Sequence, residues 1–128
     1  MFIDQYFLQP HHRLHQQTEF LWYTIGSIQC YLARNYSDPE LTVEKTSRDT
    51  HIPVSRVSEI LKSVSGIGFR SYLNKIRLNE AKRLLSESQK RISEIGYSVG
   101  YSNISHFNRT FKKIVGLSPG EYRQTQKK

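Results

Sequence analysis

The feature that most constrains the fold is an internal repeat with a period of fifty residues. When the sequence is shifted by fifty, two segments align without a gap. Five positions are identical: Glu44 with Glu94, Ser55 with Ser105, Lys62 with Lys112, Gly66 with Gly116, and Tyr72 with Tyr122. Apolar positions match in kind: Val54 with Ile104, Val57 with Phe107, Leu61 with Phe111, Val64 with Ile114, and Ile67 with Leu117. The repeat therefore predicts one structural unit that is present twice.

Each copy has the pattern of a short helix, a tight turn and a longer helix, which is the helix-turn-helix plan. The first unit is expected over about 42–66 and the second over about 92–116, each closed by a glycine. A linker helix is expected over about 69–86. The predicted helices within the units are 43–49 and 54–64 in the first, and 92–99 and 103–115 in the second. The linker of about 18 residues is roughly 27 Å long, so the two units can sit about one DNA turn apart, which is roughly 34 Å.

A further helix precedes the first unit. Leu21, Ile25, Ile28 and Leu32 recur at helical spacing, and Thr18 is a suitable N-cap. No strand-like alternation of useful length occurs. The sequence thus predicts an all-α fold of about seven helices, with two helix-turn-helix subdomains joined by a long linker helix. We expect the DNA-binding domain over 18–128, and a tail or linker remnant over 1–17.

Charge is unevenly distributed along the chain. The net charge is +8, but residues 1–68 hold 6 Lys and Arg against 7 Asp and Glu, while residues 69–128 hold 13 against 4. A basic half suits a polyanion such as nucleic acid, whereas the alternative is a charge that only aids solubility. No stretch reaches the roughly 18 apolar residues of a membrane span, and the single Cys30 forms no internal disulfide. We therefore expect a cytoplasmic protein with no membrane partner.

The sequence gives little support to an enzyme. It has no glycine-rich phosphate loop and no Cys/His metal spacing, and the adjacent Ser105 and His106 diverge by 100° on a helix. His11, His12 and His15 raise a metal hypothesis, but no Cys, Asp or Glu lies close by to complete a site, so an exposed polar tail is favoured. We expect no catalytic residue, no metal and no cofactor.

Residues 92–123 closely resemble the signature of the AraC/XylS family of bacterial transcription regulators. The matching positions are Ile92, Glu94, Ile95, Val99, Gly100, Tyr101, Ser102, Phe107, Arg109, Phe111, Lys112, Lys113, Gly116, Ser118, Pro119, Tyr122 and Arg123. The resemblance covers about residues 20–123 and implies seven helices in two subdomains. It also implies a sequence-specific regulator of transcription, an activator as in much of the family, with double-stranded DNA as its partner. An effector-binding or receiver domain missing from this chain is the further partner that it suggests, and the near-neutral first half is compatible with RNA polymerase as a protein partner.

In the second recognition helix, Phe107, Phe111 and Ile114 define the expected buried side. The resemblance places the base-reading positions on the outer side, at Ile104, Ser105, Asn108 and Arg109. Arginine can bridge guanine O6 and N7, asparagine can bridge adenine N6 and N7, and an apolar side chain can contact a thymine methyl. Lys112 and Lys113 are expected to contact phosphates, which position the protein without specifying sequence. The alternative is a solvated face on which Arg109 is structural.

The first unit fits the family less well. Thr46 and Thr50 stand where the family usually has apolar residues, which removes on the order of 1–3 kcal/mol of apolar burial each if the sites are buried. The family has a small alanine where this chain has Ser47, and often an arginine where it has Glu59.

In the first recognition helix, the expected inward residues are Val57, Ile60, Leu61 and Val64. The family's base-reading positions fall on Ser55, Ser58 and Glu59, whereas Arg56 and Lys62 are the expected phosphate contacts. Glu59 can accept a hydrogen bond from cytosine N4, but a carboxylate near phosphates is also repelled, so both roles stay open.

A helical protein-interaction module on the same scaffold is the main alternative function. The basic second half argues against it, while the near-neutral first half is compatible with a protein partner.

Overall fold

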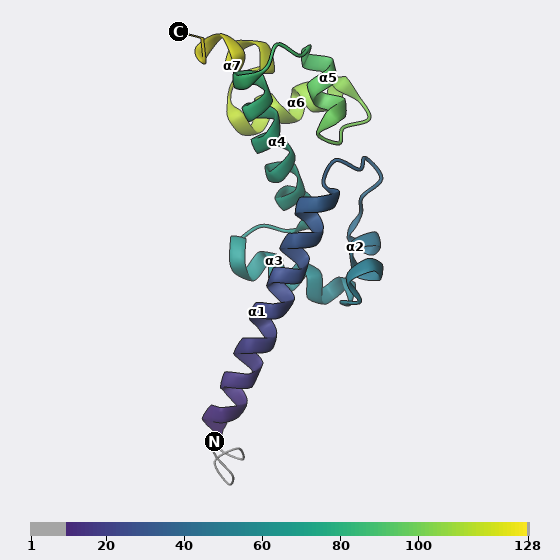
Figure 1. Ribbon diagram of the computed structural model, residues 1–128, viewed down its shortest axis with the longest axis vertical. Coiled ribbons are helices and arrows are strands. Elements are labelled where there is room, and N and C mark those ends of the chain that lie inside the picture. Colours follow the sequence, from purple (N-terminus) through teal and green to yellow (C-terminus); the bar gives the residue numbers. More distant parts are fainter. Residues whose placement is uncertain (1–9, 128) are drawn as a thin grey trace.

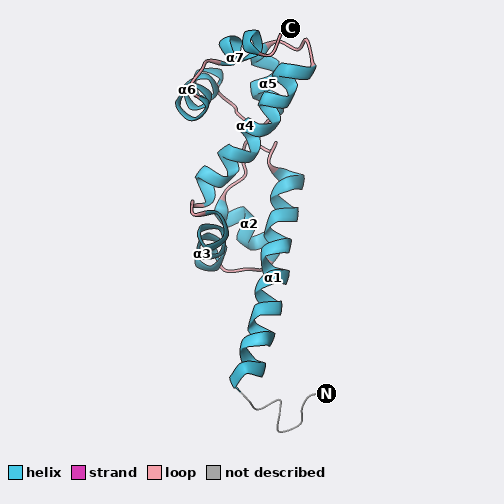
Figure 2. Ribbon diagram, turned by 90° about the vertical axis from the view of Figure 1, so that its left-hand side faces the viewer, coloured by secondary structure: helices cyan, strands magenta, loops and turns pink. Residues whose placement is uncertain are grey.

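The computed structural model describes the backbone of residues 10–127 and the side chains of residues 21–127. These residues form helices and no strand (Figures 1 and 2). The helices are α1 (Pro10–Asn35), α2 (Val43–Thr50), α3 (Val54–Ser65), α4 (Phe69–Glu87), α5 (Ile92–Ser98), α6 (Ile104–Val115) and α7 (Pro119–Thr125). The all-α fold with seven helices is confirmed, and helices α2 to α6 begin and end within a residue of the predicted bounds.

The first helix is longer than the sequence indicates. We expected it to begin after Thr18 as N-cap, but α1 begins at Pro10, so residues 10–17 of the expected tail are helical. Ile25, Ile28 and Leu32 are buried as predicted, whereas Leu21 is 37% exposed. Figure 1 shows that the N-terminal part of α1 extends past α2 and α3. The side chains of His11, His12 and His15 lie outside the part that the structure describes.

Two hydrophobic cores hold the fold together, one for each helix-turn-helix unit. The first core joins α1, α3 and the start of α4, and its fully buried centre includes Ile28, Leu32 and Val57. The second core joins the end of α4 to α5 and α6, and Phe107 and Phe111 lie at its centre with 0% exposure. Helix α4 therefore contributes one end to each core, and Figure 1 shows it crossing from one unit to the other.

The threonines of α2 are accommodated by hydrogen bonds. Thr46 is fully buried, and its hydroxyl donates to the carbonyl oxygen of Thr42 at 2.9 Å. The hydroxyl of Thr50 donates to the carbonyl oxygen of Thr46 at 2.6 Å. Because both hydroxyls are satisfied, the first unit loses apolar burial at these positions without leaving a buried polar group unpaired.

Within residues 10–127, no helix combines the length and the apolar character that crossing a membrane requires.

Candidate nucleic-acid interface

The second helices of the two units, α3 and α6, lie on the same side of the molecule. In Figure 2 both are seen nearly end-on at the left, while α1 lies on the right. They therefore run in a similar direction and present their outer faces together. In helix-turn-helix proteins this second helix enters the major groove, and its N-terminal residues face the base edges.

Helix α6 is held firmly at both ends. At its start, the side-chain oxygen of Asn103 accepts a hydrogen bond from the backbone N–H of His106 at 2.9 Å, which caps the helix. At its end, Gly116 takes φ 96°, a left-handed conformation that glycine adopts without a Cβ penalty. The rings of Phe107 and Phe111 pack edge-on with centroids 5.9 Å apart in the second core. These contacts fix which face of α6 is turned outward.

The outer face of α6 carries most of the predicted DNA contacts. The exposed side chains are Ser105, Asn108, Arg109, Lys112 and Lys113, as the helical period predicts. Ile104 is only half-buried, because its Cδ1 atom leans toward Gly96 of α5. The expectation that Ile114 is inward is wrong, since it is 54% exposed at the last turn of α6. Its place on the buried side is taken by Thr110, which is 9% exposed.

Three arginines of residues 69–128 have side-chain partners within the fold. Arg77 and Arg123 donate hydrogen bonds to backbone carbonyl oxygens, and Arg83 forms ion pairs with Glu80 and Glu87 along α4. The side chain of Arg109, in contrast, makes no hydrogen bond or ion pair with any residue that the structure describes. The described residues therefore do not support a structural role for Arg109, and its guanidinium is free to bind a ligand.

Helix α3 has an outer face equivalent to that of α6, but fewer of its predicted base-reading side chains are fully exposed. Val57, Ile60 and Leu61 are buried as expected, whereas Val64 is 44% exposed and the expectation for it is wrong. Val64 aligns with Ile114 in the repeat, and both stand at the last turn of their helix, beyond the reach of the core. Among the predicted contacts, Ser58 is half-buried; the exposed side chains are those of Ser55, Arg56, Glu59 and Lys62.

Two exposed polar residues near the two units were not among the predicted site residues. Arg70 of α4 and His106 of α6 are exposed, and both line a cleft of about 450 Å³ that also includes Thr42 and Glu44 of the first unit. The ring of His106 lies 5.6 Å from that of Tyr101. A signal was available for Arg70, because it is a basic residue in the first turn of the linker helix.

The described residues offer no metal site. Among the side chains that the structure describes, those of residues 21–127, no group of three or more His, Cys, Asp and Glu comes together, and Cys30 is exposed on α1.

Comparison with known proteins agrees with this geometry. The family of helix-turn-helix domains matches residues 46–125. The melibiose operon regulatory protein of Escherichia coli is 31% identical over 94 residues, which are 73% of this chain and 31% of that protein. The arabinose operon regulatory protein of the same organism is 30% identical over 93 residues, 73% of this chain and 32% of that protein. This chain thus spans about a third of the length of these relatives, and 12% of a regulator from Bacillus subtilis.

Solved structures show the same fold. The C-terminal domain of AraT, a response regulator from Geobacillus stearothermophilus, has a TM-score of 0.76 and 32% identity, covering 80% of this chain and 84% of that one. The DNA-binding domain of AdpA, solved in complex with a target DNA, has a TM-score of 0.73 over 79% of this chain and 90% of that one; at 19% identity, this supports the fold alone. Both are domains of regulatory proteins. The chain belongs to the AraC family of bacterial transcription regulators and carries its helix-turn-helix DNA-binding domain.

Proposed function

We propose that this domain binds specific duplex sequences by inserting α3 and α6 into successive major grooves. The observation that carries the proposal is that both recognition helices present their outer faces on the same side of one chain (Figure 2). A single chain then binds two half-sites, as a dimer does in other helix-turn-helix proteins, so its DNA site need not be palindromic.

The second unit is assigned the main role in base reading. Arg109 has a free guanidinium, suited to guanine O6 and N7, and the exposed amide of Asn108 suits adenine. Ser105 is exposed beside them. The half-buried Ile104 offers only its outer surface to a thymine methyl. Lys112 supplies a phosphate contact toward the end of the helix, as does Lys113.

The first unit is assigned a mixed role. Ser55 and Glu59 face outward for base contacts, and Ser58 has partial access. Arg56 and Lys62 are assigned to phosphates. The Glu59 carboxylate is repelled by phosphates but can accept a hydrogen bond from cytosine N4. Glu59 therefore favours sequences that offer it this bond and disfavours the others.

The wider role is regulation of transcription in the bacterial cytoplasm, where the chromosome is. We propose activation, with RNA polymerase as a further protein partner, and an effector-binding or receiver domain as the part of the regulator that senses the signal. The support is the family, together with the length of the relatives, which extend well beyond this domain.

The experiment that tests the proposal compares Arg109→Ala on a selected duplex and on random DNA. We expect specific binding to weaken by about 1–3 kcal/mol, with a smaller loss on random DNA. Arg34→Ala is the matched control, because Arg34 is also exposed and unpaired, but lies on α1. It removes the same charge and leaves the preference for the selected duplex unchanged. Equal losses on both duplexes would contradict base reading by Arg109, and no duplex binding at low salt would favour a protein-interaction module instead.

A further inference from the structure

A buried arginine lies at the junction between the two units. Arg77 of α4 is only 8% exposed. Its Nε donates to the carbonyl oxygen of Tyr36 at 2.7 Å, and its Nη2 donates to the carbonyl oxygen of Asp38 at 2.8 Å. Both acceptors belong to the loop between α1 and α2, which leads directly into the first unit. Burial lowers the pKa of Arg77, but a guanidinium stays protonated at neutral pH.

The same guanidinium also touches the second unit. Its Cζ lies 5.4 Å from the ring centroid of Tyr101, in the turn between α5 and α6. The neighbouring Gly100 has φ +113°, and a Cβ at that position would lie 2.6 Å from Arg77 Nε and 2.6 Å from the carbonyl oxygen of Tyr36. The turn of the second unit can therefore approach the loop of the first only because residue 100 is glycine. The hydroxyl of Tyr101 completes the junction by donating to Asn74 Oδ1 at 2.7 Å.

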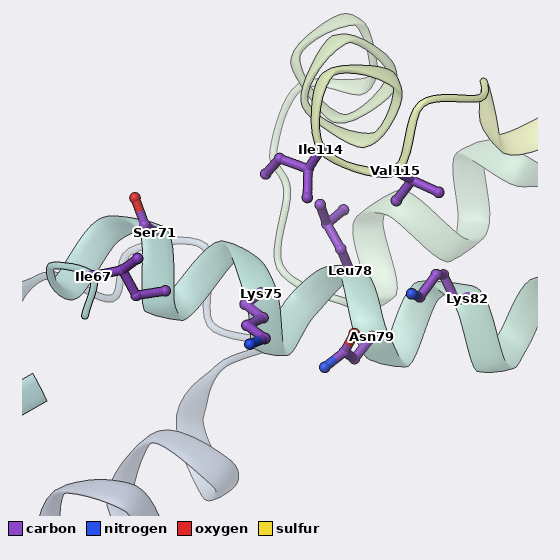
Figure 3. A pocket seen from close by; sticks show the side chains of 8 residues that line it. All are labelled: Ile67, Ser71, Lys75, Leu78, Asn79, Lys82, Ile114 and Val115. Atoms are coloured by element: carbon purple, nitrogen blue, oxygen red, sulfur yellow. The ribbon is translucent and has the colours of Figure 1, made fainter. Parts of the chain in front are cut away.

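Another side of α4 is open between the units. A cleft of about 490 Å³ lies there, lined by residues that include Ile67 and Ser71 at the first unit and Ile114 and Val115 at the second (Figure 3). Apart from a few residue pairs, the helices of the first unit do not contact α5, α6 or α7 directly. Helix α4 contacts both groups and links them. The relative placement of α3 and α6 therefore depends on the stiffness of α4 and on the junction around Arg77.

We propose that Arg77 sets the distance and twist between the two recognition helices, and thereby sets the spacing that the protein requires between its two DNA boxes. This rests on the proposed function, since it presumes that both helices enter DNA. The guanidinium is suited to the task because it has several donors in a rigid fork, whereas lysine has one flexible ammonium group. Arg77 is a positioning residue and makes no contact with DNA.

The first test measures the geometry without DNA. Spin labels are placed at Ser63→Cys and Lys113→Cys, which are exposed, repeat-equivalent positions on α3 and α6, in a Cys30→Ser background. Pulsed electron paramagnetic resonance should give one narrow distribution of the distance between the two labels for the parent protein. The distribution should be broadened or shifted for Arg77→Gln. Arg77→Lys, which keeps the charge, should lie between them.

Arg123→Gln is the matched control. Arg123 also donates to two backbone carbonyl oxygens, those of Leu85 at 3.0 Å and Ser88 at 3.2 Å, but both lie at the C-terminal end of α4, away from the loop between α1 and α2. This variant should lower stability and leave the distance distribution unchanged. An unchanged distribution in a folded Arg77→Gln protein would overturn the proposal. So would a failure of both Arg77→Gln and Arg77→Lys to fold, because Arg77 would then be needed for folding alone.

The second test uses duplexes whose two boxes differ in spacing by one base pair at a time. The parent protein should prefer one spacing, and Arg77→Gln should reduce that preference by at least about fivefold, the low end of typical coupling between sites. Arg123→Gln should keep it. If the parent protein showed no dependence on the second box, the proposed function would fail, although the distance measurement would still decide on the junction. If the parent preferred one spacing and Arg77→Gln kept the same preference, the role of Arg77 in spacing would be contradicted.

Discussion

Replacing Gly96 with alanine tests how α6 is seated, because Gly96 lies where α5 meets α6. A Cβ at this position would lie 2.8 Å from Cδ2 and 3.1 Å from Cγ of the Phe107 ring, and 2.9 Å from Cδ1 of Ile104. The end of the Ile104 side chain can turn aside. The Phe107 ring is 0% exposed and packed on all sides, so it can move only if α6 moves with it.

Two effects of opposite sign determine the magnitude. Alanine is favoured over glycine within a helix by about 1 kcal/mol. Overpacking a well-filled core costs about 1–3 kcal/mol, and contacts below 3 Å with a rigid ring point to the upper part of that range. We therefore expect Gly96→Ala to lower the free energy of unfolding by about 1–2 kcal/mol, and to weaken DNA binding because the outer face of α6 shifts.

The assay is urea unfolding monitored by circular dichroism, and Gly26→Ala is the matched control. Gly26 is also within a helix, but a Cβ there would meet nothing within 4 Å. The same substitution should raise the free energy of unfolding by about 0.5–1 kcal/mol at this position. If Gly96→Ala stabilised the protein as much as Gly26→Ala, α6 would not be packed against α5 as described, and the account of its orientation would be wrong.

Two further predictions concern charge. Lys112→Ala should reduce the slope of log K against log salt by about 0.9 on selected and random DNA alike, because a phosphate contact carries no sequence information; a loss confined to the selected duplex would contradict this role. Asp38 accepts hydrogen bonds from Lys45 Nζ at 2.7 Å and from the Glu40 N–H at 2.9 Å, and these hold its carboxyl pKa below the ordinary value. A lowered folded-state pKa stabilises the protein above the unfolded pKa of about 3.9, and this stability is lost as pH falls through the folded value. Asp38→Asn should therefore destabilise the protein near pH 6, and the difference should shrink toward pH 3 in urea unfolding, whereas parallel profiles would refute the assignment.

The local parts of the fold were predictable from the sequence because their causes are local. Ser118 caps α7, with Pro119 at its first position, and Gly66 and Gly116 end their helices in left-handed conformations. The exposed face of α6 followed from helical spacing once Phe107 and Phe111 were identified as inward.

The errors arose where burial depends on a distant neighbour. Val64 and Ile114 occupy apolar positions of the repeat, but the last helical turn reaches past the core and leaves them exposed. The prediction that Leu21 belongs to the apolar face of α1 was wrong for the same reason, because Leu21 is 37% exposed. The burial of Arg77 likewise depends on distant residues, because its acceptors lie 41 and 39 residues away in the sequence. Helical spacing contains no information on such contacts.

Selection of bound duplexes from a random pool tests the central claim most directly. If α3 and α6 both read bases in successive major grooves, the selected sequences should contain two boxes about 10 base pairs apart, since successive grooves on one side of the duplex are one helical turn apart. The box read by α6 should be the more sharply defined, because Arg109 and Asn108 are exposed on it. A single box, or two boxes with freely varying separation, would contradict the claim that one chain reads two grooves.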